Sequence, residues 1–359
     1  MNRILAFIIF FGIFFTIYFG MHFYTFMRLS AFLKMHRNLW FYLAMVALTL
    51  SFPLMSFMER FIGGQIARVF YALAATWLGA VFLLLVSLAV YEIVRLITKT
   101  NDKTAGLVIM LVVLVIVFYG IINAFFIRVN TIEIPIDNLE KETTLVQISD
   151  VHLGTIHNSG YMTRIVDKIN DINPDMVLIT GDFVDGSGKI VEHSVAPLNK
   201  LRPKTFFSTG NHEMYEGIDE VIGLLEMTKV EVLRNEVVEY KGIQVIGIDN
   251  PAREMRRTND EISKIKFDKK RPSVLMFHPP QGLEDASRAG VDLQLSGHTH
   301  NGQIFPFNLI TRIFYPKISG IYMHNDMYLH VSPGTGTWGP PMRFGSRSEI
   351  TVLNLVKRK

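Results

Sequence analysis

Five short motifs in the second half of the chain carry side chains that bind metal ions. Their carboxylate, imidazole and amide groups suit Mn, Fe or Zn better than Ca. Two such cations, about 3.5–4 Å apart, can hold a phosphate, generate a nucleophile at neutral pH and stabilise charge on a leaving oxygen. The set therefore indicates a two-metal site for phosphoester hydrolysis. The motifs are Asp150-Val151-His152, Gly181-Asp182, Gly210-Asn211-His212-Glu213, His278 and Gly297-His298-Thr299-His300.

A short apolar run precedes each motif and predicts a buried strand. The runs are too short for core helices and are bounded by polar residues and glycine. Each candidate ligand therefore falls at the carboxyl end of a strand, where open α/β sheets assemble their binding sites. The five predicted strands are Leu145–Ile148, Met176–Ile179, Thr205–Phe207, Val274–Phe277 and Leu293–Leu295.

Helical segments alternate with these strands. Apolar residues recur at helical spacing in Gly160–Asn170 and in Gly217–Met227, and alternation of this kind indicates βαβ units. Two hairpins are predicted, with turns at Lys241-Gly242 and at Asn325-Asp326. The second half is therefore predicted to have an α/β fold.

The first third of the chain is apolar enough to lie in a membrane. Of the 359 residues, 49% are hydrophobic and only 19% are charged, and the mean hydropathy is +0.28. This composition is more apolar than that of an ordinary soluble domain. The excess falls in four uncharged spans, each near or above the ~20 residues that a helix needs to cross a bilayer. We therefore predict an all-α region of four transmembrane helices. The spans are Ile4 to Met27, Asn38 to Met58, Val69 to Tyr91 and Thr104 to Ile127.

The boundary after this region is abrupt. Shortly after Arg128, Thr131–Ile136 alternates with period two and predicts an edge strand that tolerates Pro135. We predict a membrane region over residues 1–128 and a second domain over residues 129–359. Because almost no linker separates them, the second domain is expected to lie against the membrane surface.

The formal net charge of +4 belongs to the membrane region. Residues 1–128 carry ten Lys and Arg against three Asp and Glu, and the remaining residues carry 26 against 29. The basic residues therefore fit membrane loops rather than a nucleic-acid groove, and no nucleic-acid partner is expected. The absence of cysteine excludes disulfides and thiolate metal sites.

Loop charge predicts the orientation of the spans. Six Lys and Arg lie in the first and third loops, and four lie at the other ends of the spans, so the first and third loops are predicted to be cytoplasmic. Both termini and the second domain are then extracytoplasmic. The six are Arg28, Lys34, Arg37, Arg95, Lys99 and Lys103, and the four are Arg3, Arg60, Arg68 and Arg128.

The membrane region is interpreted as an anchor. His22 is the one ionisable residue inside a predicted span, and ionisable residues are what mark ion or substrate paths. Asn123 and Pro53 are interpreted as helix-packing and kink residues. The first span is also longer than the apolar core of a cleavable signal peptide, so it is expected to remain in the protein.

The five motifs together resemble the calcineurin-like metallophosphoesterase family. The runs Gly181–Gly186 and Met342–Gly345, with Gly154, look most similar to its branch of membrane-associated bacterial phosphodiesterases. The resemblance covers roughly residues 129–359. It implies a four-layer sandwich of two mixed β-sheets flanked by helices.

The resemblance also implies a role for each site residue. Asp150, His152 and His300 would bind one divalent metal ion, and Asn211, His278 and His298 would bind the other. Asp182 would bridge the two ions, and a hydroxide that also bridges them would attack phosphorus in line. His212 would protonate the leaving oxygen or stabilise the transition state.

Several other polar residues are interpreted separately. Asp185 and Glu213 either orient ligands or are simply solvated, and Arg343 either reaches a phosphate or forms a structural ion pair. Four histidines fall away from the strand ends, and surface or turn positions are expected for them: His157, His193, His324 and His330.

The apolar segment Phe305–Tyr315 follows the last metal motif. It is interpreted either as core packing or as an exposed patch that faces lipid or an acyl chain. With the short join to the membrane region, the second alternative would suit an amphiphilic substrate.

These observations predict a membrane-anchored, metal-dependent phosphoesterase that uses two Mn, Fe or Zn ions. Its substrate would be a phosphodiester or pyrophosphate, with a lipid-linked compound as one option. One alternative is a phosphomonoesterase for a soluble substrate. Another is a membrane sensor or scaffold whose metal site does not turn over.

Overall fold

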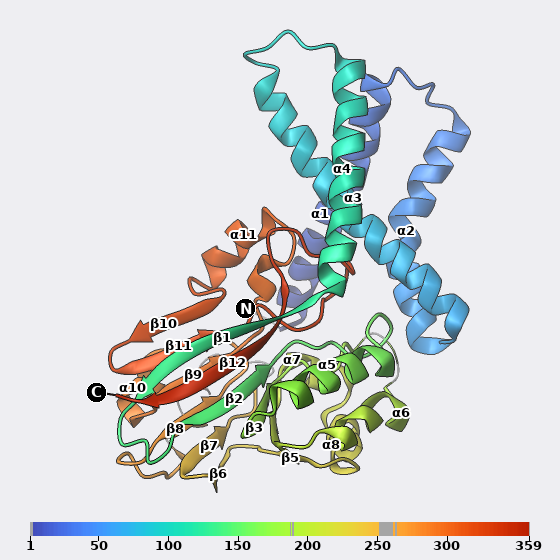
Figure 1. Ribbon diagram of the computed structural model, residues 1–359. Coiled ribbons are helices and arrows are strands. Elements are labelled where there is room, and N and C mark those ends of the chain that lie inside the picture. Colours follow the sequence, from blue (N-terminus) through green and yellow to red (C-terminus); the bar gives the residue numbers. More distant parts are fainter. Residues whose placement is uncertain (1–2, 187, 189, 251–260, 263, 359) are drawn as a thin grey trace. The chain divides into compact units, whose positions relative to one another are not determined.

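The computed structural model describes residues 3–186, 188, 190–250, 261–262 and 264–358 (Figure 1). Contacts divide the chain into two compact units. The first comprises Met1–Ile121 with Pro340–Met342, and the second comprises Ile122–Gly339 with Arg343–Lys359.

The first unit is helical. Asn38 caps the second helix by accepting a hydrogen bond from the backbone N–H of Phe41, and Tyr18 donates to the carbonyl of Thr49 at 2.6 Å. Three helices among the described residues are long and apolar enough to cross a membrane, namely α2, α3 and α4. The predicted first span lies in α1, which is not among these three. The helices are α1 (Arg3–Phe32), α2 (Leu39–Phe61), α3 (Gln65–Val94) and α4 (Asp102–Phe125).

The second unit contains two six-stranded mixed sheets flanked by helices, as predicted. The first sheet has the order β1-β12-β2-β3-β4-β5, in which β2 to β5 are parallel and β12 runs antiparallel to β2. Its strands are β1 (Ile127–Ile136), β12 (Ser348–Lys357), β2 (Thr143–Ile148), β3 (Met176–Thr180), β4 (Lys204–Ser208) and β5 (Val230–Val232).

The second sheet has the order β10-β11-β9-β8-β7-β6. Strands β11, β9, β8 and β7 are parallel, and the two antiparallel edge strands belong to the predicted hairpins. Its strands are β10 (Gly320–His324), β11 (Met327–Val331), β9 (Leu293–Ser296), β8 (Ser273–Met276), β7 (Ile243–Gly247) and β6 (Glu236–Tyr240).

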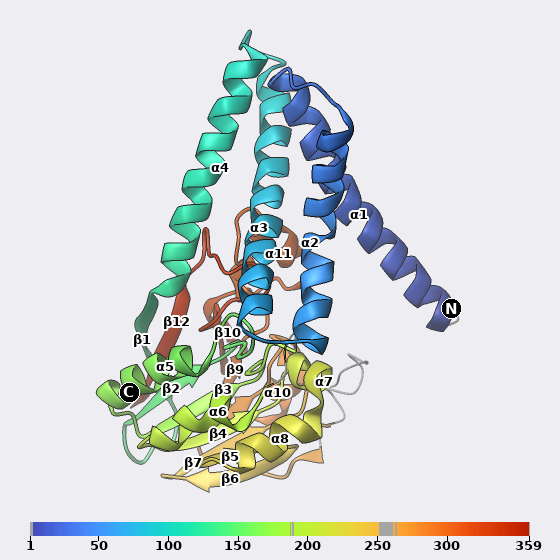
Figure 2. The same ribbon diagram turned by 90° about the vertical axis from the view of Figure 1, so that its right-hand side faces the viewer.

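Short helices cover the outer faces of the sheets. In Figure 2, α5, α6 and α8 lie on one side of the first sheet, and apolar residues of α5 and α8 pack onto that sheet. Helix α10 covers the second sheet, and a third apolar cluster fills the space between the sheets. The helices are α5 (Ser159–Ile172), α6 (Glu192–Val195), α7 (Asn211–Glu216), α8 (Ile218–Glu226), α10 (Leu283–Ala289), α11 (Phe307–Phe314) and the 3-10 turns η1 (Ala196–Lys200) and η2 (His300–Gly302).

Strand register brings the predicted ligands together. Ile148 lies opposite Ile179, and Thr180 lies opposite Ser208, so β2, β3 and β4 end at a common edge. Met276 and Leu295 are paired near the ends of β8 and β9 in the other sheet. Because parallel strands end level, the loops that follow them meet at one edge of the sandwich.

The last turn of α4 belongs to the second unit. Asn123 donates hydrogen bonds from Nδ2 to the carbonyls of Arg343 (3.0 Å) and Ser346 (2.8 Å). Ser348 donates to the carbonyl of Ala124 at 3.1 Å. Asn123 was predicted to pack against another helix, but its amide instead bonds a loop of the second unit. Strand β1 then begins at Ile127, so the join is as short as expected.

Candidate metal centre

The backbone is strained where it carries the predicted ligands. Left-handed conformations are unfavourable for residues other than glycine, and they cluster at functional sites. Five of the seven predicted ligands adopt them, with φ between 49° and 71°. These residues are Asp150, His152, Asp182, His298 and His300.

Two glycines let the ligand loops pass close to one another. A Cβ on Gly210 would lie 2.2 Å from Oδ1 of Asp182, and a Cβ on Gly297 would lie 2.0 Å from Oγ of Ser149. Contacts this short cannot form, so any other residue would displace a ligand loop. The glycines next to the ligands are therefore required by the close approach of the backbone.

Gly297→Ala is expected to lower metal binding and thermal stability together. The new Cβ would also meet Oδ2 of Asp150 at 2.2 Å, so either the loop or Asp150 must move. Gly223→Ala in α8 is the matched control, because nothing lies within 4 Å of its Cβ, and it is expected to stabilise the fold by about 0.4–1 kcal/mol. Bound metal and melting temperature would be measured for both. Wild-type metal content in Gly297→Ala would contradict this account of the loop.

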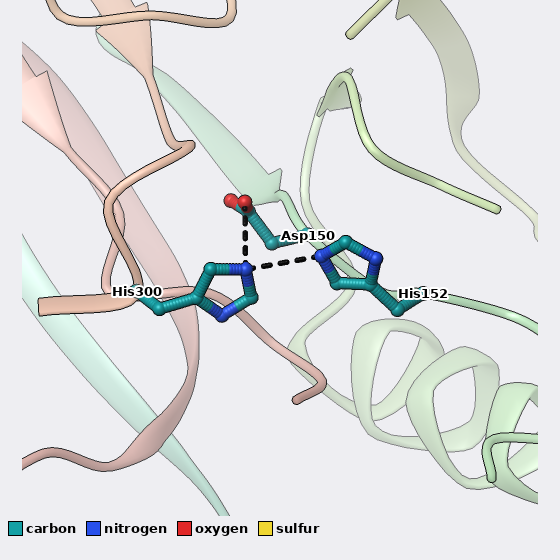
Figure 3. Close-up of side chains that lie close together, drawn as sticks. All are labelled: Asp150, His152 and His300. Atoms are coloured by element: carbon teal, nitrogen blue, oxygen red, sulfur yellow. Dashed lines mark hydrogen bonds and ion pairs between the residues drawn. The ribbon is translucent and has the colours of Figure 1, made fainter. Parts of the chain in front are cut away.

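Asp150, His152 and His300 form the first cluster of side chains that could hold a metal ion (Figure 3). His300 Nε2 lies 3.0 Å from His152 Nε2 and 3.3 Å from Oδ1 of Asp150. Two nitrogens that each lie ~2.0–2.1 Å from one cation are themselves roughly 3 Å apart. The spacing therefore fits a single cation shared by these side chains.

Asp182, His278 and His298 form the second cluster. His278 Nε2 lies 3.0 Å from Oδ2 of Asp182, while its Nδ1 donates to the carbonyl of Thr180 at 2.8 Å. The bond to Thr180 fixes the ring and directs Nε2 toward the site, as second-shell partners of metal-binding histidines do.

Unpartnered buried atoms show that the side chains fit a cation. Oδ1 of Asn211 and Nδ1 of His298 are buried and have no hydrogen-bond partner within the described parts of the chain. Leaving buried polar atoms unsatisfied costs about 1–3 kcal/mol each, and a metal ion would satisfy them. Amide oxygen and imidazole nitrogen are ligands that Mn, Fe and Zn accept.

The protonation states of His152, His298 and His300 favour cation binding. Burial lowers the pKa of His298 to about 4, and burial is also the main reason that the pKa values of His152 and His300 lie well below their usual range. These imidazoles are therefore neutral at pH 7, as metal ligands must be. Burial opposes charge on Asp182 and His278, but their attraction prevails: it raises the pKa of His278 to about 10 and holds that of Asp182 well below its usual range. His278 therefore carries a proton at pH 7 in the absence of metal, and a cation would have to displace that proton in order to bind its Nε2.

His212 lies beside both clusters but is oriented differently. Its Nδ1 donates to the carbonyl of Asp185 at 2.6 Å, which leaves Nε2 4.0 Å from Oδ2 of Asp182. Its ring lies edge-on to that of His152, with the centroids 4.6 Å apart. The backbone N–H of His212 also donates to Oδ1 of Asp182 at 2.9 Å. The second ring nitrogen is thus available near the point where the clusters meet.

Glu213 and Asp185 support the ligands rather than lying in solvent. Glu213 is fully buried, and its carboxylate accepts hydrogen bonds from the backbone N–H groups of Gly210, Asp182, Phe183 and Val184 at 2.6–3.2 Å. Oδ1 of Asp185 lies 3.6 Å from Nδ1 of His152, and Asp185, His152 and His212 form a third group with metal-binding side chains. Of the two alternatives for these carboxylates, the structure favours the orienting role.

Tyr315 is a supporting residue that the motifs did not reveal. Its hydroxyl lies 2.9 Å from Nε2 of His298, which leaves Nδ1 of that ring for the site. Tyr315 lies seventeen positions after His298 and was assigned only to an apolar segment. Its aromatic type gave no sign of a contact with a ligand.

Tyr315→Phe is expected to weaken metal affinity by about 10–100-fold, the usual cost of losing such a partner. The ring of His298 would lose the bond that fixes its orientation. Tyr322→Phe is the matched control, because the hydroxyl of Tyr322 bonds only the carbonyl of Ser319 among described contacts. Metal affinity would be measured by competition with a chelator. Equal affinities for the two variants would show that Tyr315 does not position His298.

Among the described residues, Arg343 forms hydrogen bonds with a loop instead of an ion pair. It is fully buried, and its guanidinium donates to the carbonyls of His300, Gly334 and Gly336 and to Oγ of Ser346 at 2.6–3.3 Å. Burial lowers the pKa of Arg343 to about 10. The side chain therefore holds the loop of His300 in place from behind.

The predicted positions of two of the four remaining histidines are wrong. His157 and His330 are buried rather than on the surface or in turns. His157 bonds Thr337 and stacks on Tyr161, and His330 lies in β11. His193 and His324 are at least partly exposed, as expected. None of the four belongs to the three groups of metal-binding side chains described above.

A polar chain joins the two sheets beneath the site. Nδ1 of His330 lies 2.6 Å from Oε1 of Gln147, whose amide donates to Oγ1 of Thr180 (2.8 Å) and to the carbonyl of Ser296 (3.0 Å). Gln147 is a polar residue within the apolar run of β2, and it was the only indication of this polar network in the sequence. These hydrogen bonds fix the ends of the strands that precede the candidate ligands.

Comparison with known proteins agrees with the predicted family. The calcineurin-like phosphoesterase family matches residues 143–302. An uncharacterized metallophosphoesterase of Campylobacter jejuni is 31% identical over 313 residues, which cover 82% of this chain and 84% of the relative. An uncharacterized metallophosphoesterase of Helicobacter pylori is 36% identical, and the match covers 64% of each chain, which is less than two thirds of that relative. A transmembrane protein with metallophosphoesterase domain from Danio rerio is 32% identical over 68% of this chain and 61% of the relative.

The fold and the clusters define an α/β protein whose His and Asp side chains could bind metal at the edge of two sheets. The chain belongs to the calcineurin-like metallophosphoesterase family. Three helices in the described part of the chain could span a membrane, and some of its relatives are named as transmembrane proteins.

Proposed function

We propose that the protein is a membrane-anchored phosphoesterase that uses two divalent metal ions. One ion would be held by Asp150, His152 and His300, and the other by Asn211, His278 and His298 with Asp182 between them. The observation that carries the proposal is the convergence of these side chains, with buried atoms left unpartnered, in two adjacent groups. We propose that the two ions are Mn, Fe or Zn.

Each part of the site would have a separate task. The two cations would neutralise the phosphate and make water nucleophilic at neutral pH. Asp182 supplies negative charge between the clusters, and Glu213 fixes its backbone. His212 would donate a proton from Nε2 to the leaving oxygen, because its Nδ1 is already bonded to Asp185.

The proposed substrate is a phosphodiester or pyrophosphate at the membrane, with a lipid-linked compound as one option. Two features support it: the single residue, Phe126, that separates α4 from β1, and the exposed apolar side of α11. The proposal keeps the membrane region at residues 1–128 with four spans and places the catalytic domain outside the cytoplasm. A reporter fused after Lys359 that works only in the cytoplasm would overturn that sidedness.

Hydrolysis of model substrates tests the proposed reaction. The full-length protein with Mn is expected to cleave bis-p-nitrophenyl phosphate faster than p-nitrophenyl phosphate. Much faster cleavage of the monoester would replace the proposal by a phosphomonoesterase. If two ions bind and neither ester is cleaved, the protein is better described as a sensor or scaffold.

A further inference from the structure

Helix α11 exposes its apolar side. Ile313 and Phe314 are 76% and 71% exposed, and Leu309 and Ile310 are also exposed. No residue of this helix is buried. The expectation that this segment packs in the core is therefore wrong for α11. Its apolar side chains are exposed, as the alternative requires, and their contact with lipid stays a prediction.

On the polar side of α11, Asn308 and Thr311 are half-buried, whereas Arg312 is exposed. At 3.6 residues per turn, Asn308, Thr311 and Arg312 lie opposite the apolar residues. The backbone of Asn308 packs against Gly302, where an added Cβ would meet its Cα at 2.3 Å. A surface helix of a soluble domain normally turns its apolar side inward, so α11 has the reverse orientation.

Short contacts connect α11 with the end of α4 inside the second unit. Phe305, just before the helix, donates its backbone N–H to the carbonyl of Phe344 at 2.7 Å, and the two rings lie 6.4 Å apart. The adjacent residues Arg343 and Ser346 accept hydrogen bonds from Asn123 in the last turn of α4. The apolar helix therefore starts close to the point where a helix that could span a membrane ends.

The chemistry around α11 suits lipid. Phe125 and Phe126, at and directly after the end of α4, are exposed and add apolar aromatic surface to the same unit. From Leu293 to Asn325 the chain contains no Asp or Glu, while Arg312 and Lys317 provide positive charge. An exposed apolar helix with basic neighbours is typical of segments that lie in the membrane interface.

We propose that α11 lies in the interfacial layer of the bilayer, with Leu309, Ile310, Ile313 and Phe314 among the acyl chains. The partner is the lipid surface next to the end of α4, rather than a second copy of the chain. This placement does not depend on catalysis. If the proposed function also holds, the bond from Tyr315, directly after α11, to His298 would bring the metal centre close to the lipid headgroups.

Site-directed spin labelling of the full-length protein in phosphatidylcholine–phosphatidylglycerol vesicles tests this placement. The chain has no cysteine, so Ile313→Cys provides a single labelling site. Glu226→Cys, at the exposed end of α8 in the same unit, is the matched control. The label at position 313 is expected to be accessible to oxygen and shielded from a water-soluble nickel chelate, and the label at position 226 is expected to show the opposite preference.

Two outcomes would overturn the proposal. Equal exposure of both labels to the nickel chelate would place α11 in water. Shielding of position 313 from both reagents would mean that protein, including a second copy, covers it. Because neither readout requires turnover, a lipid-buried label in a protein without activity would refute the proposed function and leave this placement intact.

Discussion

Asp182→Asn is expected to reduce hydrolysis of bis-p-nitrophenyl phosphate by more than about 100-fold, because loss of a supporting partner alone costs up to about that much. The pKa of Asp182 lies well below its usual range, so the carboxylate is charged at neutral pH. Its carboxylate contacts Nε2 of His278 and accepts a hydrogen bond from the backbone N–H of His212. The asparagine removes the charge and keeps the shape. Rate and bound metal would be measured together.

Asp171→Asn is the matched control for Asp182→Asn. Asp171 is exposed near the end of α5, and its change is expected to leave both rate and metal content unaltered. Far-ultraviolet circular dichroism would verify that each variant is folded. If folded Asp182→Asn retains the wild-type rate, the two-metal mechanism is wrong.

His212→Asn is expected to lower kcat for an alkyl phosphodiester by about 10²–10⁴-fold, the usual contribution of a general acid. The loss is expected to be smaller for bis-p-nitrophenyl phosphate, because p-nitrophenolate leaves readily without a proton. Metal content is expected to remain at the wild-type value, since His212 is not among the proposed ligands. Rates for both substrates, with bound metal, provide the measurement.

His193→Asn serves as the control for His212→Asn, because His193 is exposed and bonds only Ser159 among described contacts. It is expected to behave as wild type. If His212→Asn slows both substrates by the same factor, His212 is not the acid. If that variant loses metal, His212 acts as a ligand.

The sequence predicted the local elements of the second unit well. The apolar runs before the motifs became β2, β3, β4, β8 and β9, because each strand is short, buried and bounded by polar residues. The hairpins at Lys241-Gly242 and Asn325-Asp326 also formed. Strand register then explains why the predicted ligands of separate motifs lie together. Whether they bind metal remains a prediction.

Long-range contacts account for what the sequence did not predict. Nothing in the local pattern shows that β12 lies between β1 and β2, or that Asn123 bonds Ser346, 223 residues away. The environment of Arg343 was not predicted for the same reason, since most of its partners are backbone carbonyls, which no residue type reveals. Periodicity also cannot show which side of α11 faces the domain, because a helix that packs on a protein core and a helix that lies on a membrane have the same amphipathic pattern.

The central claim is that two metal ions at this site support phosphoester hydrolysis, and a titration of metal content against activity tests it most directly. Full-length protein depleted of metal would be reloaded with Mn in steps, and bound Mn and the rate on bis-p-nitrophenyl phosphate would be measured at each step. The account predicts two Mn per chain at saturation and full activity only when both are bound. Full activity with one ion per chain, or activity that persists after complete depletion, would contradict it.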